Sequence, residues 1–130
     1  MQLYLVRHAE ATPGQPDELR PLSEEGQAQA RELGERLHSE GVAPDVVLTS
    51  PLLRARQTGE ALARATGSTH ETDDRLAPGA TPDTVREAVT GRGERVIVVG
   101  HQPDCGRIAA ELGDGVEPRF PAGGMVVLEL

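Results

Sequence analysis

The sequence predicts an α/β fold in three layers, with a mostly parallel central sheet between two layers of helices. Short apolar runs at 2–7, 45–50 and 95–101 have the length and composition of buried strands. Between them lie longer segments in which apolar residues recur at helical spacing. Strands that alternate with helices in this way form parallel sheets covered on both faces.

The first quarter of the chain predicts a strand, a loop and a helix. The strand at 2–7 runs into a Pro-rich loop at 11–22. Ser23 is a favourable N-cap, and the two glutamates after it suit the positive end of a helix. The helix ends near Gly41 and has one apolar face, formed by Ala30, Leu33 and Leu37.

The next segment predicts a second strand–helix pair. The strand at 45–50 is followed by Ser50 as N-cap and Pro51 at the first helical position, where a missing N–H has no cost. This helix ends at Gly67. Residues 68–80 are irregular, with room for a short edge strand.

The remaining elements are shorter. A Thr-Pro pair opens a helix over 81–89, and 95–101 is the most strand-like run of the chain. A further helix covers 103–113, and 125–130 forms a last strand. We find no linker and no repeat, so we expect residues 1–130 to form a single domain.

Composition and charge exclude several classes of function. The net charge is −8 and the only aromatic side chains are Tyr4 and Phe120, so a nucleic-acid-binding role is not expected. The chain contains no lysine, which excludes a Schiff-base or P-loop lysine. We expect no signal peptide and no membrane contact. The single Cys105 cannot form an internal disulfide and fits a cytoplasmic location.

Basic side chains follow several of the predicted strands. Arg7 and His8 end the first strand, Arg54 lies in the first turn of the helix after the second, and His101 ends the third long strand. Because α/β sheets place ligands at the carboxyl ends of their strands, we expect these four side chains to converge. Two arginines and two histidines suit a dianionic phosphoryl group, and a neutral histidine can act as a nucleophile.

Three segments carry a resemblance to a known family. LVRHAEA, SPLLRARQT and VVGHQPD resemble the signature segments of the histidine phosphatase superfamily, which contains phosphoglycerate mutases and many phosphatases. The resemblance covers the chain in order. The small size and the RPLSEEG stretch look most like the SixA branch, the phosphohistidine phosphatases. The family most often has Gly where Ala9 follows the Arg-His pair.

The resemblance implies a phosphoglycerate mutase-like fold and a role for each matching residue. His8 would be the nucleophile and become a transient phosphohistidine. Arg7 and Arg54 would bind the phosphoryl oxygens, and His101 would donate another hydrogen bond. Arg20 matches a family position that reaches back into the phosphate pocket.

The general acid of larger family members has no obvious equivalent. Those members supply a glutamate from an insertion, but the corresponding residues 75–83 contain no Glu and leave little room for a lid. Glu10 and Asp104 are the remaining candidate acids near the same edge. An imidazole leaves more easily than an alkoxide because its nitrogen takes up a proton near neutral pH. We therefore expect a phosphohistidine on a signalling protein as substrate, in an open groove.

Two other functions stay open. The same fold could hydrolyse small phosphomonoesters, or it could only bind phosphorylated ligands with little catalysis. Cys105 is not a nucleophile of the Cys-x5-Arg type, because position 111 is Glu. We expect no cofactor and no metal site, since Arg7 and Arg54 would repel a cation beside the two histidines.

Overall fold

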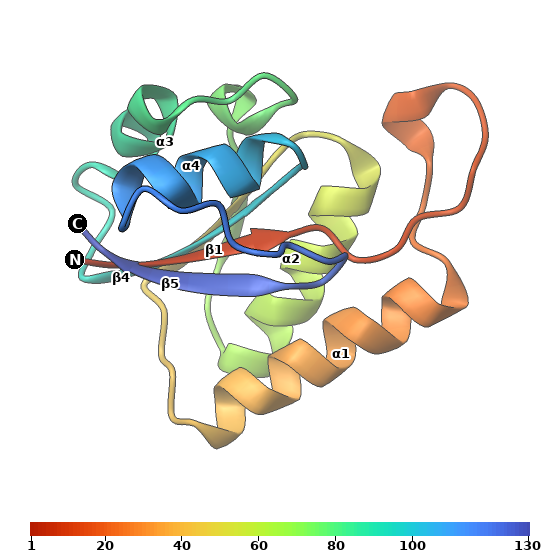
Figure 1. Cartoon of the computed structure of the whole chain (residues 1–130). Helices are drawn as coiled ribbons and strands as arrows, with labels where there is room; N and C mark the ends of the chain where they lie inside the picture. Colours follow the sequence, from red (N-terminus) through yellow and green to blue (C-terminus); the bar gives the residue numbers. More distant parts are fainter.

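Five strands form one sheet in the computed structural model, which describes residues 1–130 (Figure 1). Their order across the sheet is β3-β2-β4-β1-β5. The first four strands are parallel and β5 is antiparallel to β1. The bounds are β1 Gln2–Arg7, β2 Val46–Thr49, β3 His70–Thr72, β4 Arg95–Gly100 and β5 Met125–Glu129.

Helices cover both faces of this sheet. In Figure 1, α1 and α2 lie on one side of the strands, and α3 and α4 lie on the other. The predicted three-layer α/β fold is therefore confirmed. The helices are α1 Glu24–Ser39, α2 Leu53–Thr66, α3 Pro82–Val89 and α4 Asp104–Leu112, with short 3₁₀ turns at Asp17–Leu19 and Asp74–Leu76. None of these helices combines the length and apolar character needed to span a membrane.

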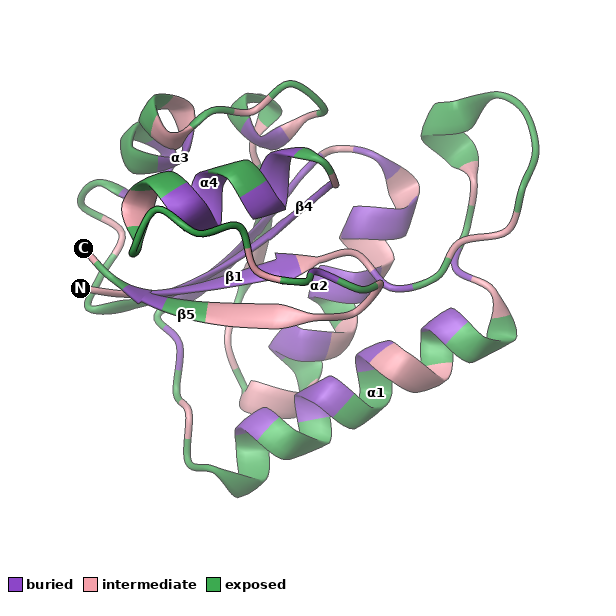
Figure 2. Ribbon diagram, viewed as in Figure 1, coloured by how far each residue is buried: buried purple, intermediate pink, exposed green.

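The central strands β1, β2 and β4 are apolar and buried along their middle positions, because both of their faces are covered. On β1, Leu3 and Leu5 pack with the α3 and α4 layer, whereas Tyr4 and Val6 pack with the α1 and α2 layer. Figure 2 shows these strands and the sheet-facing sides of the helices as buried. Successive side chains point to opposite faces of a strand, so a run without polar residues is what a doubly covered sheet requires.

Most of the expected helix ends are confirmed. The Ser23 hydroxyl accepts a hydrogen bond from Gly26 N, and Thr81 caps α3 through Thr84 N. Gly67 ends α2 with φ of 73°, a left-handed conformation that favours glycine.

The prediction that Ser50 is the N-cap of α2 is wrong. The helix begins only at Leu53, and Pro51 precedes it. The Ser50 hydroxyl is fully buried and contacts His101, while it also accepts a hydrogen bond from Leu52 N at 3.2 Å. The hydroxyl thus shapes the turn between β2 and α2 and joins it to the end of β4.

The parallel strands place the segments that follow them along one edge of the sheet. The chain leaves β1 at His8, β2 at Ser50 and β4 at His101 on this edge. The segment between β3 and α3 holds only the Asp74–Leu76 turn and a short loop, so no lid is inserted there. The two termini meet at the opposite edge, where Leu130 N donates to Met1 O at 2.8 Å.

Candidate active site

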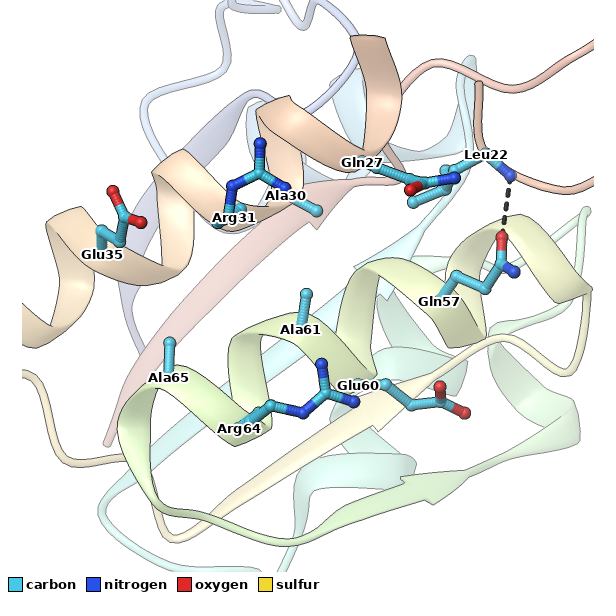
Figure 3. A pocket seen from close by; sticks show the side chains of 10 residues that line it. All are labelled: Leu22, Gln27, Ala30, Arg31, Glu35, Gln57, Glu60, Ala61, Arg64 and Ala65. Carbon is cyan, nitrogen blue, oxygen red and sulfur yellow. Dashed lines mark hydrogen bonds between the residues drawn. The ribbon is translucent and has the colours of Figure 1, made fainter. Parts of the chain in front are cut away.

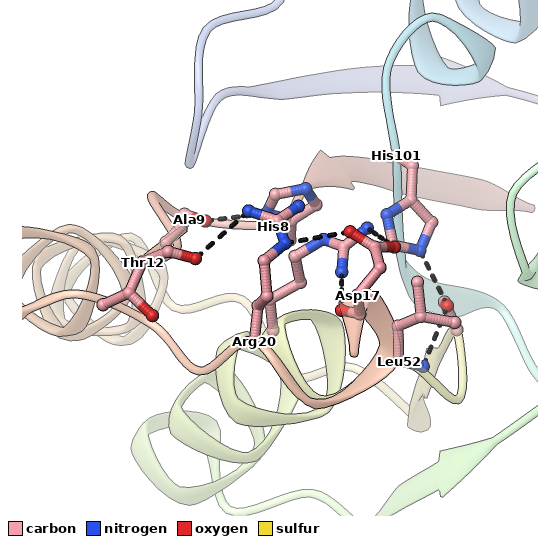
Figure 4. A network of polar contacts seen from close by, with 9 residues as sticks. His8, Ala9, Thr12, Asp17, Arg20, Leu52 and His101 are labelled. Atoms are coloured by element: carbon pink, nitrogen blue, oxygen red, sulfur yellow. Dashed lines mark hydrogen bonds and ion pairs between the residues drawn. The ribbon is translucent and has the colours of Figure 1, made fainter. Parts of the chain in front are cut away.

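A cavity of about 470 Å³ opens at the carboxyl edge of the sheet. Its lining combines the residues that end β1 and β4, the start of α2 and the loop after β1. Figure 4 shows the polar contacts among several of these side chains. The lining residues are Arg7, His8, Glu10, Ala11, Asp17, Arg20, Arg54, Pro78, His101, Gln102 and Ala122. All five predicted phosphate-site residues are among them.

His8 is held in one orientation by the backbone. Its Nδ1 lies 2.7 Å from the carbonyl oxygen of Ala9, visible in Figure 4. Because a carbonyl can only accept, Nδ1 carries the proton, and Nε2 of the neutral ring keeps its lone pair. Burial lowers the pKa of His8 to about 4, against the opposing effect of the Ala9 carbonyl, and the charges of Arg54 and Arg7 lower it further. The ring is therefore neutral at physiological pH.

His101 lies beside His8, with the two ring centroids 5.2 Å apart. Its Nε2 lies 2.7 Å from the Ser50 hydroxyl oxygen. The Ser50 hydroxyl, which accepts from Leu52 N, can either donate its proton to Nε2 or accept from it through its second lone pair. The Nδ1 of His101 is buried and has no protein partner. Burial, with the neighbouring His8 and Arg54, lowers the pKa of His101 to about 3.

Three arginines contribute the positive charge of the cavity. Arg7 donates from Nη1 to the carbonyl oxygen of Phe120 at 3.0 Å, and its Nε is buried without a partner. Arg54 is buried and likewise has a free Nε. Arg20 comes from the loop after β1 and donates from Nη1 to Thr12 O at 3.2 Å. The guanidinium groups therefore have donors available for an oxyanion.

Thr58 fixes the position of the strand that carries His8. Its buried hydroxyl accepts from Ala9 N at 3.0 Å and donates to Arg54 O at 2.8 Å. The two hydrogen bonds join the end of β1 to the first turn of α2. Sequence reasoning gave Thr58 no role, although its spacing of four residues after Arg54 places both on one helix face.

Gly26 allows α1 to lie against the same loop. A Cβ at this position would overlap the backbone carbonyl of Glu10. Ser23 N donates to that same carbonyl at 3.0 Å. The start of α1 thus packs directly on the chain two residues after His8.

The two candidate acids occupy different places. Glu10 lines the cavity and its Oε1 accepts from the Ser23 hydroxyl at 3.2 Å. Asp104 is buried outside the lining, where its Oδ2 accepts from Gly79 N at 2.7 Å and Oδ1 lies 3.4 Å from Arg107. Asp104 thus ties the loop before α3 to the start of α4, and its carboxylate does not face the cavity.

Asp17 also lines the cavity, although the sequence did not identify it as a site residue. Its carboxylate lies between two arginines, with Oδ1 2.9 Å from Arg20 Nε and Oδ2 3.2 Å from Arg54 Nη2. Figure 4 labels Asp17 and Arg20, which lie side by side in this network. The hydrogen bond from Arg20 lowers the pKa of Asp17 below its usual range, so this carboxyl is ionised. No periodicity marks a residue of this irregular loop as a site residue.

A second depression, of about 440 Å³, lies between α1 and α2 (Figure 3). Its floor is formed by small or apolar side chains such as Ala30 and Ala61, and its rim carries Arg31, Glu35 and Arg64. It is lined by no His, Cys, Ser or Thr side chain, so we place the chemistry at the sheet edge. Across the molecule, no three His, Cys, Asp or Glu side chains are grouped as metal ligands would be.

The chain is similar in sequence and fold to several known proteins. Residues 3–78 match the family model described as histidine phosphatase superfamily (branch 1). The phosphohistidine phosphatase SixA of Escherichia coli K12 is 33% identical over 125 residues, which cover 91% of this chain and 78% of that protein. A structure of the protein histidine phosphatase SixA complexed with tungstate superposes with a TM-score of 0.90 at 31% identity, covering 100% of this chain and 88% of the other. A probable phosphoglycerate mutase of Klebsiella pneumoniae is 39% identical over 83 residues, 58% of this chain and 37% of that protein.

The three-layer α/β fold and these matches define a protein of the histidine phosphatase class. The chain belongs to the histidine phosphatase superfamily.

Proposed function

We propose that this chain, residues 1–130, is one phosphatase domain that uses His8 as its nucleophile and acts on phosphohistidine in a protein. The main support is the state of His8. Its ring is neutral, its Nδ1–H is fixed on Ala9 O, and Nε2 is left with a lone pair in a cavity lined by three arginines. A nucleophilic imidazole needs this tautomer and this orientation.

The cavity supplies the charge that a phosphoryl group requires. Arg7, Arg20 and Arg54 line it, and guanidinium groups bind phosphate oxygens with paired donors. In the tautomer whose Nε2 accepts from Ser50, the buried Nδ1 of His101 carries the ring proton and is a further donor without a protein partner. Phosphoryl transfer depends mainly on such positioning and charge neutralisation. The tungstate bound by the related SixA structure is itself an oxyanion.

The reaction takes two steps. In the first, the Nε2 lone pair of His8 forms a bond to phosphorus, and the substrate P–N bond breaks with its electron pair returning to the substrate imidazole. A proton on the other ring nitrogen makes this imidazole a neutral leaving group. In the second, water attacks the phosphorus of phospho-His8, the P–N bond breaks, and inorganic phosphate is released while His8 recovers its lone pair.

The carboxylates of the cavity favour this substrate. Glu10 and Asp17 are the only acidic residues that line it, and Asp17 is held ionised by Arg20. An ionised carboxyl cannot protonate an alkoxide, whereas a phosphoimidazole brings its own proton. The short segment between β3 and α3 also leaves the mouth open to a side chain presented by another protein.

The first test is replacement of the nucleophile. His8→Ala should abolish release of phosphate from a phosphohistidine protein, with an unchanged circular dichroism spectrum. The wild-type chain should form an acid-labile, base-stable phosphoryl adduct that this variant lacks. Turnover by a folded His8→Ala variant at the wild-type rate would refute the mechanism.

Small phosphomonoesters are a second candidate substrate class, favoured by the similarity to a probable phosphoglycerate mutase. Phosphohistidine protein and a panel of phosphorylated metabolites should be compared at equal concentration. We expect kcat/KM to be higher for phosphohistidine. Equal or higher values for unactivated esters would assign the site to metabolites, and binding without any turnover would identify a phospholigand-binding module.

A further inference from the structure

We propose that Asp17 is an internal anion which occupies the phosphoryl-binding arginines of the resting site and is displaced by the substrate. This inference rests on the proposed function only for the assignment of these arginines to the phosphoryl group. It adds a feature that the reaction itself does not need: a carboxylate of the protein that competes with the substrate for the anion-binding site.

The contacts of Asp17 resemble those of a bound oxyanion. Its two carboxylate oxygens are divided between Arg20 and Arg54, and both distances are within hydrogen-bond range. Its backbone carbonyl also accepts from Arg54 Nη1 at 2.9 Å. The carboxylate therefore uses the guanidinium donors that a phosphoryl group would use.

The arginines explain why such an anion is present. Arg54 has a side chain only 7% exposed, and a buried guanidinium without a counter-charge is strongly unfavourable. Arg7 is also partly buried and has no carboxylate partner. In the absence of ligand, Asp17 is the carboxylate that compensates Arg54.

The position of Asp17 permits its displacement. It begins the Asp17–Leu19 turn, its side chain is 51% exposed, and its carboxylate makes no hydrogen bond except those with the two arginines. Rotation about the Cα–Cβ bond would release both carboxylate contacts and leave the backbone contact to Arg54 intact. A phosphoryl dianion offers more charge and more acceptors to the same donors, so it can replace the carboxylate.

The same exchange acts on the product. Inorganic phosphate left in the cavity after hydrolysis competes with the returning carboxylate of Asp17. The carboxylate therefore weakens product inhibition and favours release of phosphate.

The test is the affinity for inorganic phosphate, measured by calorimetry at pH 7.5 without any substrate. Asp17→Asn keeps the shape of the side chain but removes its charge. We expect the Kd for phosphate to fall by about three- to tenfold, the range of a partly exposed ion pair. Phosphate should also become a stronger product inhibitor by a similar factor. Asp17→Ser, which shortens the side chain, should change both constants in the same direction.

Glu18→Gln is the matched control, because it removes one negative charge from the same turn at a residue with no side-chain contact. It should leave the Kd for phosphate within about twofold of the wild-type value. An unchanged or higher Kd in a folded Asp17→Asn variant would overturn the inference and show that the carboxylate only orients the arginines. An equal fall of the Kd for phosphate in Glu18→Gln would also overturn the inference, since the change in net charge would then explain the effect. The Kd measurements need no turnover, so they stand apart from the test of His8 as nucleophile.

Discussion

The ionisation of His8 offers a direct test of the site. Burial, with the charges of Arg54 and Arg7, lowers its pKa to about 4, from a usual value of 6.5. At pH 5.5 an ordinary imidazole would be neutral in only about 9% of molecules, whereas one with a pKa near 4 would be neutral in about 97%. The supply of nucleophile should therefore be nearly constant from pH 8 to pH 5.5 and should fall only as the pH approaches 4.

Nitrogen NMR of histidine-labelled protein measures this directly. The chain has 4 histidines, so each ring can be assigned from a set of single variants. We expect the His8 ring at pH 7.5 to be the Nδ1–H tautomer and to show no protonation of Nε2 at pH 5.5. His38 lies exposed near the end of α1, away from the cavity, and serves as the internal reference.

Two results would refute the reasoning. A midpoint for His8 near 6.5 would mean that solvent and not the protein sets its charge. An Nε2–H tautomer at pH 7.5 would mean that the Ala9 carbonyl does not orient the ring, and the proposed nucleophile would then carry a proton.

Two further predictions concern the residues that support His8. Thr58→Val should leave the buried N–H of Ala9 without a partner, so it should lower the free energy of unfolding by about 1–3 kcal/mol and reduce kcat. Urea titration measures the first effect and a steady-state assay measures the second. Thr58→Ser should retain both hydrogen bonds, and equal losses in the two variants would contradict the role of the hydroxyl. Gly26→Ala should force α1 away from the Glu10 carbonyl and therefore lower the melting temperature. Gly41→Ala is the control: its Cβ would meet open space, so it measures only the cost of a left-handed backbone conformation. An unchanged melting temperature for Gly26→Ala would show that the contact is relieved without cost.

The sequence predicted the fold and the principal lining of the cavity because both follow from local pattern and topology. Uninterrupted apolar runs marked doubly covered strands, and residues directly after those strands must share one edge of a parallel sheet. This rule predicts the positions of Arg7, His8 and His101. The position of Arg54 is predicted by the helix that follows β2. Arg20 could be placed only through the family resemblance, since its loop has no periodicity.

Other features depended on contacts between distant segments. Ser50 has the sequence of a helix cap, but its hydroxyl is engaged by His101 from another strand, and the helix begins later. Asp17 has no signal in the sequence, and only the fold brings Arg54 of α2 beside its carboxylate. Asp104 lies near the correct edge in sequence, yet its carboxylate turns to the backbone of Gly79. Side-chain direction in loops and at helix starts is set by partners that no local pattern identifies.

The meeting of the two chain ends has a practical consequence. Met1 and Leu130 are joined by backbone hydrogen bonding at the amino edge of β1, and the six residues of that strand separate them from His8 by about 20 Å. Tethering the molecule to a sensor chip through either end would leave the cavity facing the solution. Binding of a phosphorylated partner could then be followed on an immobilised enzyme whose mouth is unobstructed.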